Sequence, residues 1–398
     1  MNRVMPMLVL VLLTSRMGGN LSAKSALSKV RPIKEIYIAL RTVASSGSGT
    51  KSDPYDGSTA TKLDNVLRAI SDGTTIHFGP GLFLSNGFQD GSTSLGFYVK
   101  PGCRYIGAGE SQTTFRVMST STGNIHLGGA FCSWNPNDSI IADVSGASVE
   151  HMTIDINGAA LVAGGAGGAD LATFGVSLPG KNNTIRHIHL IGMYGHEATG
   201  REAFGLGTVV SATNSTLTGN LIENCAVDNF ASGNDYGQMI CISGGIARNN
   251  WVIGQRTMTS AYQAYGANEI LDNCNAINCK MFLYMDTGDA GPVRVQNCHA
   301  WGITGDFVNL TPSDGFSHHD VTITNNTAEI ASGGTFLTAH PGGKGAKLYN
   351  ISVLKNTTTK TSGLFTPFNL DHVRNFHSGG NRWLKTSAPK QMGDRITN

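Results

Sequence analysis

A short phrase centred on an asparagine recurs through the second half of this chain. It first appears as Leu221–Val227, where two apolar runs flank Asn224. Its further copies are Ile246–Val252, Ile270–Ala276 and the segments around Asn297, Asn325 and Asn356. The asparagines lie 24 to 31 residues apart. A period of this length indicates a stack of coils, none of which can bury its apolar face alone.

The apolar runs within each copy alternate in the manner of β-strands, and nothing between them has helical periodicity. Short strands that meet at one fixed asparagine predict a parallel β-helix. Each asparagine then lies about 4.8 Å above its equivalent and can bond to it through the side-chain amide. We therefore expect four asparagines to stack at one corner, namely Asn224, Asn249, Asn273 and Asn297.

Two earlier copies carry histidine where the later ones carry asparagine. They surround His151 and His187, and their coils are longer than the later ones by roughly a dozen residues. The additional residues form the insertions Gly158–Asp170 and Gly192–Arg201. Insertions in a solenoid become loops, frequently on one face, and loops carry function more often than the scaffold does.

The composition suits such a stack. The chain has 51 glycines and only 14% charged residues, and its 40% of hydrophobic residues exceeds what a disordered chain contains. A solenoid is one domain of arbitrary length, so 398 residues require no second domain.

The net charge of +2 and the lack of any RNA- or DNA-reading motif argue against a nucleic-acid partner. No run of 18 apolar residues occurs, so no membrane span is expected.

Residues 1–23 resemble a secretory signal peptide. A basic start precedes the apolar run Val4–Leu13, and small residues before Lys24 resemble a cleavage site, although Pro6 and Arg16 interrupt the pattern. We therefore expect a secreted, periplasmic or cell-surface protein.

The remaining boundaries follow from the repeat. We expect a linker over 24–51, the β-helix domain over 52–383 and a polar tail over 384–398. The glycosylation sequons at Asn325 and Asn356 fall on the asparagine corner, where a glycan would break the stack. This placement favours a bacterial origin.

Three of the seven cysteines, Cys225, Cys274 and Cys298, directly follow a corner asparagine. We expect them to point inward as small buried hydrophobes. Cys274 and Cys279 lack the spacing and the histidine partners of a zinc site. His318-His319-Asp320 comes at a turn before a strand. There, solvated polar residues are expected rather than metal ligands, so no metal site is predicted.

A helix is predicted near the start of the domain, over Ser58–Ile70, with Ser58 or Thr59 as its N-cap. Its apolar positions share one face and are Leu63, Val66, Leu67 and Ile70. The first coil of a solenoid has an exposed hydrophobic end, so we expect this helix to cap it, with Lys62 and Arg68 exposed.

The order of helix, Asp72–Phe83 (DGTTIHFGPGLF), Gly102–Ser111 (GCRYIGAGES) and asparagine-bearing coils resembles the pectate-lyase-like superfamily. The resemblance covers roughly residues 52–383. It implies an all-β fold, a single-stranded right-handed parallel β-helix with an N-terminal capping helix. Members of the superfamily include polysaccharide lyases, polygalacturonase-type hydrolases, epimerases, phage tailspike depolymerases and proteins without known activity.

No catalytic residue can be carried over from these relatives. The polygalacturonase-type motifs Asn-x-Asp, Asp-Asp, Gly-His-Gly and Arg-x-Lys do not occur here in order. The Arg-x-x-Pro-x-x-Arg motif of calcium-dependent pectate lyases is also missing. Candidate residues must therefore come from their positions along the coil.

Arg256 and Lys280 each lie seven residues after a corner asparagine. Two cations on adjacent coils either extend into solvent or bind the carboxylate of an acidic sugar. Asp235 and Asp286 lie two coils apart, about 9.6 Å along the stack, at the upper edge of the separation in inverting glycosidases. Tyr262 is placed between them by the same count.

The predicted site therefore has three catalytic and five binding residues. The catalytic candidates are Asp235, Asp286 and Tyr262. The substrate-binding candidates are Arg256, Lys280, Tyr236, Tyr284 and Asp306. Under the alternative interpretation, the aspartates cap turns and the tyrosines stack along the coils for stability.

The leading functional hypothesis is an exported lyase or glycoside hydrolase that acts on an acidic polysaccharide. The alternative is a non-catalytic carbohydrate-binding or adhesin-type β-helix, which the missing motifs favour. No motif requires a cofactor, and calcium stays open. The expected partner is a polysaccharide, and the oligomeric state is left open.

Overall fold

The computed structural model describes residues 34–385. Its gaps are 43–44, 91–93, 119–126, 133, 136–139, 142, 164–171, 195–202, 209–216, 229–236, 255–258, 287, 332 and 362–365. The predicted signal peptide and nearly all of the predicted polar tail lie outside the described residues.

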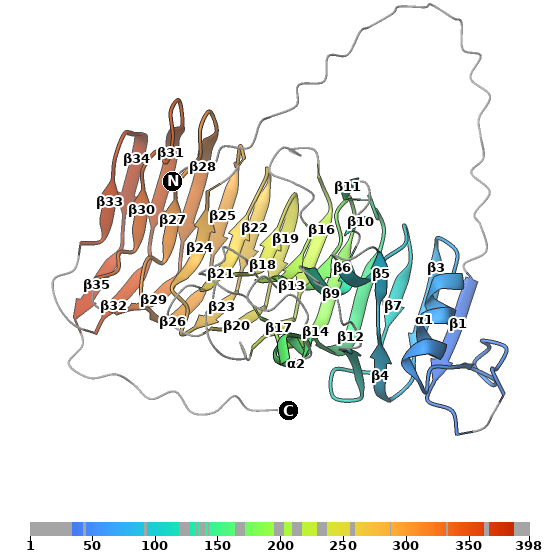
Figure 1. The fold of residues 1–398 in the computed structure, drawn as a ribbon. Helices are drawn as coiled ribbons and strands as arrows, with labels where there is room; N and C mark the ends of the chain where they lie inside the picture. The colour runs from blue at the N-terminus through green and yellow to red at the C-terminus, as the bar shows by residue number, and fades with distance from the viewer. Residues whose placement is uncertain are drawn as a thin grey trace, which may run out of the picture. The chain divides into compact units, whose positions relative to one another are not determined.

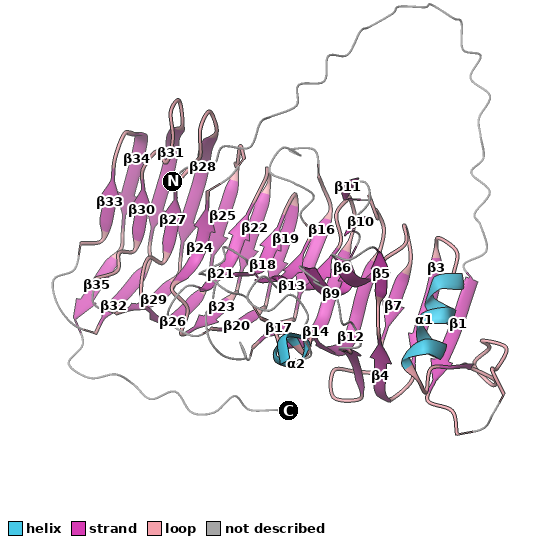
Figure 2. Ribbon diagram, viewed as in Figure 1, coloured by secondary structure: helices cyan, strands magenta, loops and turns pink. Residues whose placement is uncertain are grey.

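The described chain is built almost entirely of parallel strands that stack in three ladders (Figures 1 and 2). The predicted all-β, parallel architecture is therefore confirmed. The first ladder follows the chain in order. It consists of β1 (Lys34–Ala39), β3 (Thr74–Phe78), β7 (Arg104–Ile106), β12 (Ser148–Asp155), β14 (Thr184–Ile191), β16 (Asn220–Glu223), β19 (Gly245–Arg248), β22 (Glu269–Asp272), β25 (Val293–Gln296), β28 (Ser317–Thr324), β31 (Lys347–Leu354) and β34 (Val373–Gly379).

The second ladder shares β12 and β14 with the first, because these two long strands bend around the corner between the ladders. Its other strands are β4 (Gly81–Ser85), β8 (Thr113–Val117), β17 (Ala226–Val227), β20 (Trp251–Ile253), β23 (Asn275–Ile277), β26 (His299–Ile303), β29 (Thr327–Ile330), β32 (Thr357–Lys360) and β35 (Arg382–Lys385). With the short β2 (Tyr55–Asp56), which pairs with β1, the two ladders make one 22-stranded sheet.

The third ladder is a separate 11-stranded sheet. It contains β5 (Phe88–Asp90), β6 (Ser94–Tyr98), β9 (Leu127–Cys132), β13 (Ala172–Ser177), β15 (Ala203–Gly207), β18 (Gly237–Ile242), β21 (Thr259–Ala264), β24 (Met281–Met285), β27 (Val308–Leu310), β30 (Leu337–Ala339) and β33 (Phe368–Leu370). Only β5 and β6 pair antiparallel within it. A small antiparallel pair, β10 (Trp134–Asn135) and β11 (Ile140–Ile141), and the short helix α2 (Gly158–Ala163) lie outside the ladders.

The predicted corner between the first two ladders is formed by residues with positive φ. Asn224, Asn249 and Asn273 have φ of 54°, 57° and 50°, a left-handed conformation that asparagine tolerates better than most residues. The Asn249 amide donates to Asn224 Oδ1 at 3.2 Å, and the Asn273 amide donates to Asn249 Oδ1 at 2.9 Å. Asn297 shares the conformation, but its amide donates to Asp272 Oδ1 at 2.8 Å. The predicted corner is therefore confirmed for all four asparagines, and the bonds between their side chains for the first three.

Histidines take the corner in the earlier coils, as predicted. His151 and His187 have φ of 58° and 50°, and their rings stack with centroids 4.6 Å apart. At the other end the prediction was wrong by one residue. Lys355, with φ of 56°, occupies the corner, and Asn356 lies one position beyond it.

A second asparagine stack, which the period does not reveal, lies inside the coils at the position after the corner. Asn326 and Asn356 are buried there on adjacent coils, and the Asn326 amide donates to Asn356 Oδ1 at 3.0 Å. Asn326 also bonds to the preceding coil, where its Oδ1 accepts from Cys298 N at 2.8 Å and its amide donates to Val295 O at 3.0 Å. Asn250, at the same position of an earlier coil, bonds in the same way to Cys225 N and Ile222 O of the coil before it. Coils without this asparagine carry the inward cysteines, which are buried and free, as predicted: Cys225, Cys274 and Cys298.

The predicted N-terminal helix forms as α1 (Ala60–Ala69). Its N-cap is Thr59, whose hydroxyl accepts from Lys62 N at 3.3 Å. Of the predicted apolar face, Leu63, Leu67 and Ile70 are buried, whereas Val66 is half-buried. Strand β1 precedes the helix, so the segment predicted as a linker contains the first strand of the sheet. The helix lies beside β1 in Figure 1, and its role as a cap stays a prediction.

The His318–Asp320 segment differs from the expectation of a solvated turn. His318 is fully buried, and neither ring nitrogen has a partner among the described residues. Burial lowers its pKa to about 4. His319 stacks on Tyr349, and Asp320, in the middle of β28, has a φ of 53° and accepts from the Asn350 amide at 2.9 Å.

Candidate functional site

The outer face of the third ladder carries its side chains in three columns that run along the stack. The registers of the parallel pairs define the first two. Column one contains Gly129, Phe174, Phe204, Gln238, Ser260, Met281, Asp306 and Thr335. Column two contains Cys132, Ser177, Gly207, Cys241, Gln263, Tyr284, Asn309 and Thr338. Column three follows the strand ends and contains Tyr265, Asp286, Thr311 and His340.

A cavity of about 470 Å³ lies over this face, across β18, β21, β24 and β27. Its lining includes amide, carboxylate, aromatic, ammonium and imidazole groups, from Gln238, Lys280, Tyr284, Asp286, Asp306 and His340. Four residues predicted from the sequence therefore meet in one cavity. Three others, Asp235, Tyr236 and Arg256, lie outside the described residues.

The predicted placement of Tyr262 in this site was wrong. Its side chain is fully buried in the core, and its hydroxyl donates to Asn250 O at 3.1 Å and Asn275 O at 2.9 Å. Burial raises its pKa well above the ordinary value for tyrosine. The error comes from a difference in loop length between adjacent coils. Before the loop, Trp251 pairs with Asn275, an offset of 24 residues. After the loop, Tyr262 pairs with Leu283, an offset of only 21 residues.

The loop between β20 and β21 is therefore three residues longer than the one between β23 and β24. A count from the corner asparagine places Tyr262 level with Asp286, whereas the register places Tyr265 there. The Tyr265 hydroxyl donates to Gln238 Oε1 at 2.6 Å, which ties column three to column one at the edge of the cavity.

Asp306 is held by hydrogen bonds to both of its oxygens. The Asn309 amide donates to Oδ2 at 2.9 Å, and Thr335 donates to Oδ1 through its backbone N at 3.2 Å and its hydroxyl at 2.7 Å. Three donors therefore fix the orientation of the Asp306 carboxyl group and occupy both of its oxygens.

Asp286 is positioned differently. Gln263 donates from Nε2 to Asp286 Oδ1 at 2.8 Å, and the backbone carbonyl of Asp286 accepts from Ser313 N at 2.8 Å and Ser313 Oγ at 2.6 Å. Gln263 is 1% exposed, and its Oε1 has no partner in the described part of the chain. In column three, Thr311 separates Asp286 from His340, so these two lie two strands apart, about 9.6 Å along the stack.

A buried carboxyl group supports the edge of the cavity. Glu269 is 1% exposed, and its Oε1 accepts from Gly244 N and Tyr265 N, each at 3.2 Å. Burial raises the pKa of Glu269 to about 8, so the group is mostly protonated at neutral pH. Sequence reasoning missed Glu269 together with Gln238, Gln263, Tyr265, Asn309 and His340. A correct strand register would have found the outward-facing ones, because they align with Tyr284 and Asp286.

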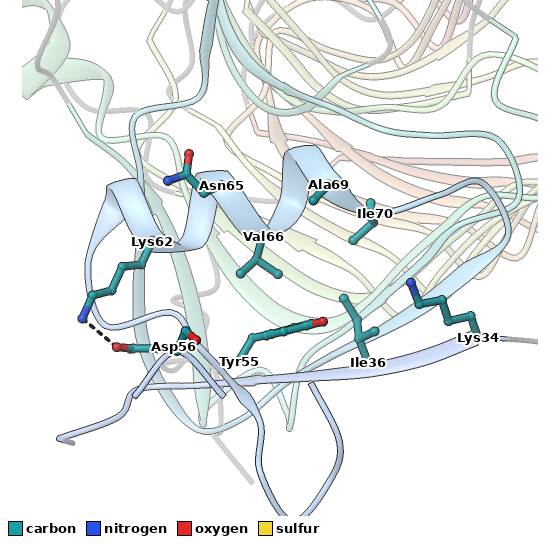
Figure 3. Close-up of a pocket in the computed structure, with 10 residues that line it drawn as sticks. Lys34, Ile36, Tyr55, Asp56, Lys62, Asn65, Val66, Ala69 and Ile70 are labelled. Carbon is teal, nitrogen blue, oxygen red and sulfur yellow. Dashed lines mark hydrogen bonds and ion pairs between the residues drawn. The ribbon is translucent and has the colours of Figure 1, made fainter. Parts of the chain in front are cut away.

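A second cavity, of about 410 Å³, lies between α1 and β1 (Figure 3). Tyr55, Ile36 and Val66 give it an apolar lining, and Lys62 bonds to Asp56 Oδ2 at 2.7 Å on its rim. That bond holds the pKa of Asp56 well below its usual range. This second cavity offers fewer polar groups than the third-ladder cavity. We therefore take the third-ladder cavity as the candidate site.

Within the described ranges, no three His, Cys, Asp or Glu side chains are grouped so as to hold a metal ion. No described helix has the length and apolar character needed to cross a membrane.

Comparison with known proteins relates the chain to others by fold only. No protein-family model matches it, and no curated protein matches its sequence. Among solved structures it is similar to a double mutant of the tailspike protein of E. coli bacteriophage HK620, with a TM-score of 0.62 and 13% identity over 83% of this chain and 60% of that one. A tailspike mutant in complex with a pentasaccharide matches with a TM-score of 0.61 and 13% identity, over 89% of this chain and 64% of that one.

The endo-xylogalacturonan hydrolase from Aspergillus tubingensis matches with a TM-score of 0.55 and 11% identity, over 91% of this chain and 98% of that one. The chain thus spans about 60% of the tailspike chain and nearly the whole hydrolase. These likenesses confirm the resemblance to right-handed parallel β-helix proteins at the level of fold.

Proposed function

We propose that this chain is an exported, polysaccharide-active β-helix protein whose binding surface is the outer face of the third ladder. The observation that carries the proposal is the single cavity that gathers Lys280, Tyr284, Asp286 and His340 on that face. A stack of parallel strands presents a long, regular surface, which matches the repeated units of a linear glycan. The fold is shared with a pentasaccharide-bound tailspike and an endo-xylogalacturonan hydrolase, and this supports a glycan as the ligand.

The ligand we propose is an acidic glycan. An ammonium group in a cavity binds a sugar carboxylate through charge-assisted hydrogen bonds, and Lys280 supplies that group. Tyr284 offers a ring face for the C–H groups of a sugar and a hydroxyl for its edge. Asp306 accepts hydrogen bonds from Asn309 and Thr335 and orders these side chains at the cavity.

Of the two reactions considered, β-elimination fits the cavity better than hydrolysis by two carboxylates. Elimination needs a base for the proton beside the sugar carboxylate and a cation that stabilises the developing enolate. Asp286 and Lys280 have the chemistry for these roles, and His340 has the chemistry to protonate the leaving oxygen. Hydrolysis needs a second carboxyl group as the acid, and Asp306 is poorly placed for that role because protein donors already bind both of its oxygens.

The experiment is a panel of polysaccharides, with polygalacturonate, alginate and hyaluronan as acidic members and xylan and dextran as neutral ones. Cleavage is measured by ultraviolet absorbance of unsaturated products and by reducing ends, and binding by calorimetry. Asp286→Asn should lower the elimination rate by about 10²-fold or more while leaving binding within a few-fold.

Lys280→Ala should weaken binding of acidic members by about tenfold or more, or about 1.4 kcal/mol. Lys347→Ala, an exposed lysine on the first ladder, serves as the matched control. Binding without cleavage would support the non-catalytic alternative. A parent protein that binds no member of the panel would contradict the proposal.

A further inference from the structure

The third-ladder face continues beyond the cavity toward the N-terminus, where its character changes. Phe174 on β13 and Phe204 on β15 are register partners, and their rings stack with centroids 5.1 Å apart and planes 10° from parallel. Both side chains are half-buried rather than in the core. Two aromatic rings therefore lie on the outer side of the same sheet as the cavity.

The two rings belong to the column that lines the cavity. Phe204 pairs with Gln238, and Gln238 pairs with Ser260; both of these partners line the cavity. The rings thus lie one and two strands from Gln238, about 4.8 and 9.6 Å along the stack. Lys280 directly precedes β24, and β24 lies three strand spacings from β15, roughly 14 Å along the stack.

Small residues lie beside the rings in the second column. Cys132, Ser177 and Gly207 are register partners there, so the surface next to Phe174 and Phe204 carries small side chains. In these two columns, β9, β13 and β15 carry no charged side chain. The cavity, by contrast, contains Lys280, Asp286 and Asp306 in addition to its amides.

We propose that Phe174 and Phe204 form a second glycan subsite, which takes an uncharged sugar residue by its apolar C–H face. This inference rests on the proposed function and narrows it. A homopolymer of uronic acid would place a carboxylate beside the two rings. The two columns carry no charged side chain there that could compensate the carboxylate for its lost hydration. The ligand is therefore a heteropolysaccharide in which acidic and neutral residues share one chain, with the acidic residue at Lys280 and the neutral one at the rings.

The test compares oligosaccharides of graded length from polygalacturonate, an acidic homopolymer, and hyaluronan, in which acidic and neutral residues alternate. The main variant is Phe174→Leu/Phe204→Leu, which keeps apolar volume but removes both rings. The matched control is Tyr349→Leu, which removes a ring from another stacked pair, His319 and Tyr349, on the first ladder at 5.1 Å. Melting curves establish that each variant is folded.

We expect the parent to bind long hyaluronan oligosaccharides at least tenfold more tightly than polygalacturonate oligosaccharides of equal length. The double leucine variant should bind the long hyaluronan chains about tenfold more weakly than the parent. Its affinity for disaccharides, which reach only Lys280, should equal that of the parent. Tyr349→Leu should have the affinity of the parent at every length.

Three results would overturn the inference, and they distinguish its failure from that of the proposed function. If Lys280→Ala weakens binding but the double leucine variant equals the parent at every length, the subsite is wrong and the proposed function stands. The same holds if the parent prefers polygalacturonate. If the parent binds neither polymer and no other member of the panel, the proposed function fails and the inference fails with it.

Discussion

Two asparagine stacks run side by side through this molecule, one at the outer corner of the coils and one directly inside it. Asn325 and Asn326 show the contrast within one dipeptide, because Asn325 is exposed at the corner and Asn326 is 1% exposed in the core. The outer stack recurs often enough to reveal the fold from sequence. The inner stack satisfies buried backbone groups, and we infer that it contributes more to stability.

The largest difference between the stacks should appear when Asn326 is replaced by alanine. The change leaves Cys298 N and Val295 O without their side-chain partners inside the coil. Two unsatisfied buried groups should lower the free energy of unfolding by about 3 kcal/mol. Chemical denaturation measures this loss.

The matched control is Asn325→Gly, in the adjacent position. Glycine accepts the φ of 57° that the corner requires, so this change should cost about 0.5 kcal/mol. Equal losses in the two variants would contradict the assignment of stability to the inner stack.

A buried carboxyl group extends the comparison to pH. Glu269 has a folded-state pKa of about 8, against an ordinary value of 4.5. The native state therefore keeps a proton that the unfolded state loses, and stability should fall as the pH rises from 4.5 to about 8. Glu269→Gln, which imitates the protonated group, should remove this part of the pH dependence.

The variant should exceed the parent in unfolding free energy by up to about 5 kcal/mol at pH 9 and should resemble it at pH 4. Thermal unfolding monitored across this pH range gives the measurement. If the two proteins have parallel pH profiles, Glu269 is ionised in the folded state and the assignment is wrong.

His151, at the histidine part of the corner, should have the opposite pH dependence and a smaller effect. Burial, followed by the neighbouring His187, lowers the pKa of His151. Stability from this group is therefore present above its ordinary pKa of 6.5 and lost as the pH falls below it. The double change His151→Asn/His187→Asn should add about 1 kcal/mol at pH 5 and almost nothing at pH 8.

Each single histidine variant is the control, because one ring without the other has no like-charge neighbour in the stack. His151→Asn removes the histidine whose pKa is lowered, so it should retain more of the gain than His187→Asn. A gain of equal size at pH 8 would show that asparagine is preferred for its backbone conformation alone.

The fold was predictable from the sequence because the corner needs a left-handed residue in every coil. Asn224, Asn249 and Asn273 meet that need in a recurring context, and the period follows from it. Asn356 was misplaced because lysine takes the corner in its coil, and an asparagine one position further on imitates the motif. The inner stack was hidden because cysteine replaces asparagine in several coils.

The site was only partly predictable, since a count of residues along a coil fails wherever a loop changes length. Lys280 and Asp286 belong to a coil with a short loop, and they line the cavity together. Tyr262 follows a loop that is three residues longer, and the shift carries it into the core. Gln263 had no signal in the sequence, because its importance depends on its bond to Asp286. The functional roles of these residues stay predictions.

The smallest effect should come from the outer stack itself, at Asn273. Its amide donates to Asn249 Oδ1 at 2.9 Å, but both side chains are exposed, so water can replace the bond. Asn273→Gly keeps the φ of 50° available and should cost only about 0.5 kcal/mol. Asn273→Ala loses the same bond and must also hold a Cβ in the left-handed region, which adds about 1 kcal/mol. Denaturation of the two variants in parallel separates the backbone cost from that of the amide. If the glycine variant loses as much as Asn326→Ala, the exposed stack is as important for stability as the buried one, and the contrast between them is wrong.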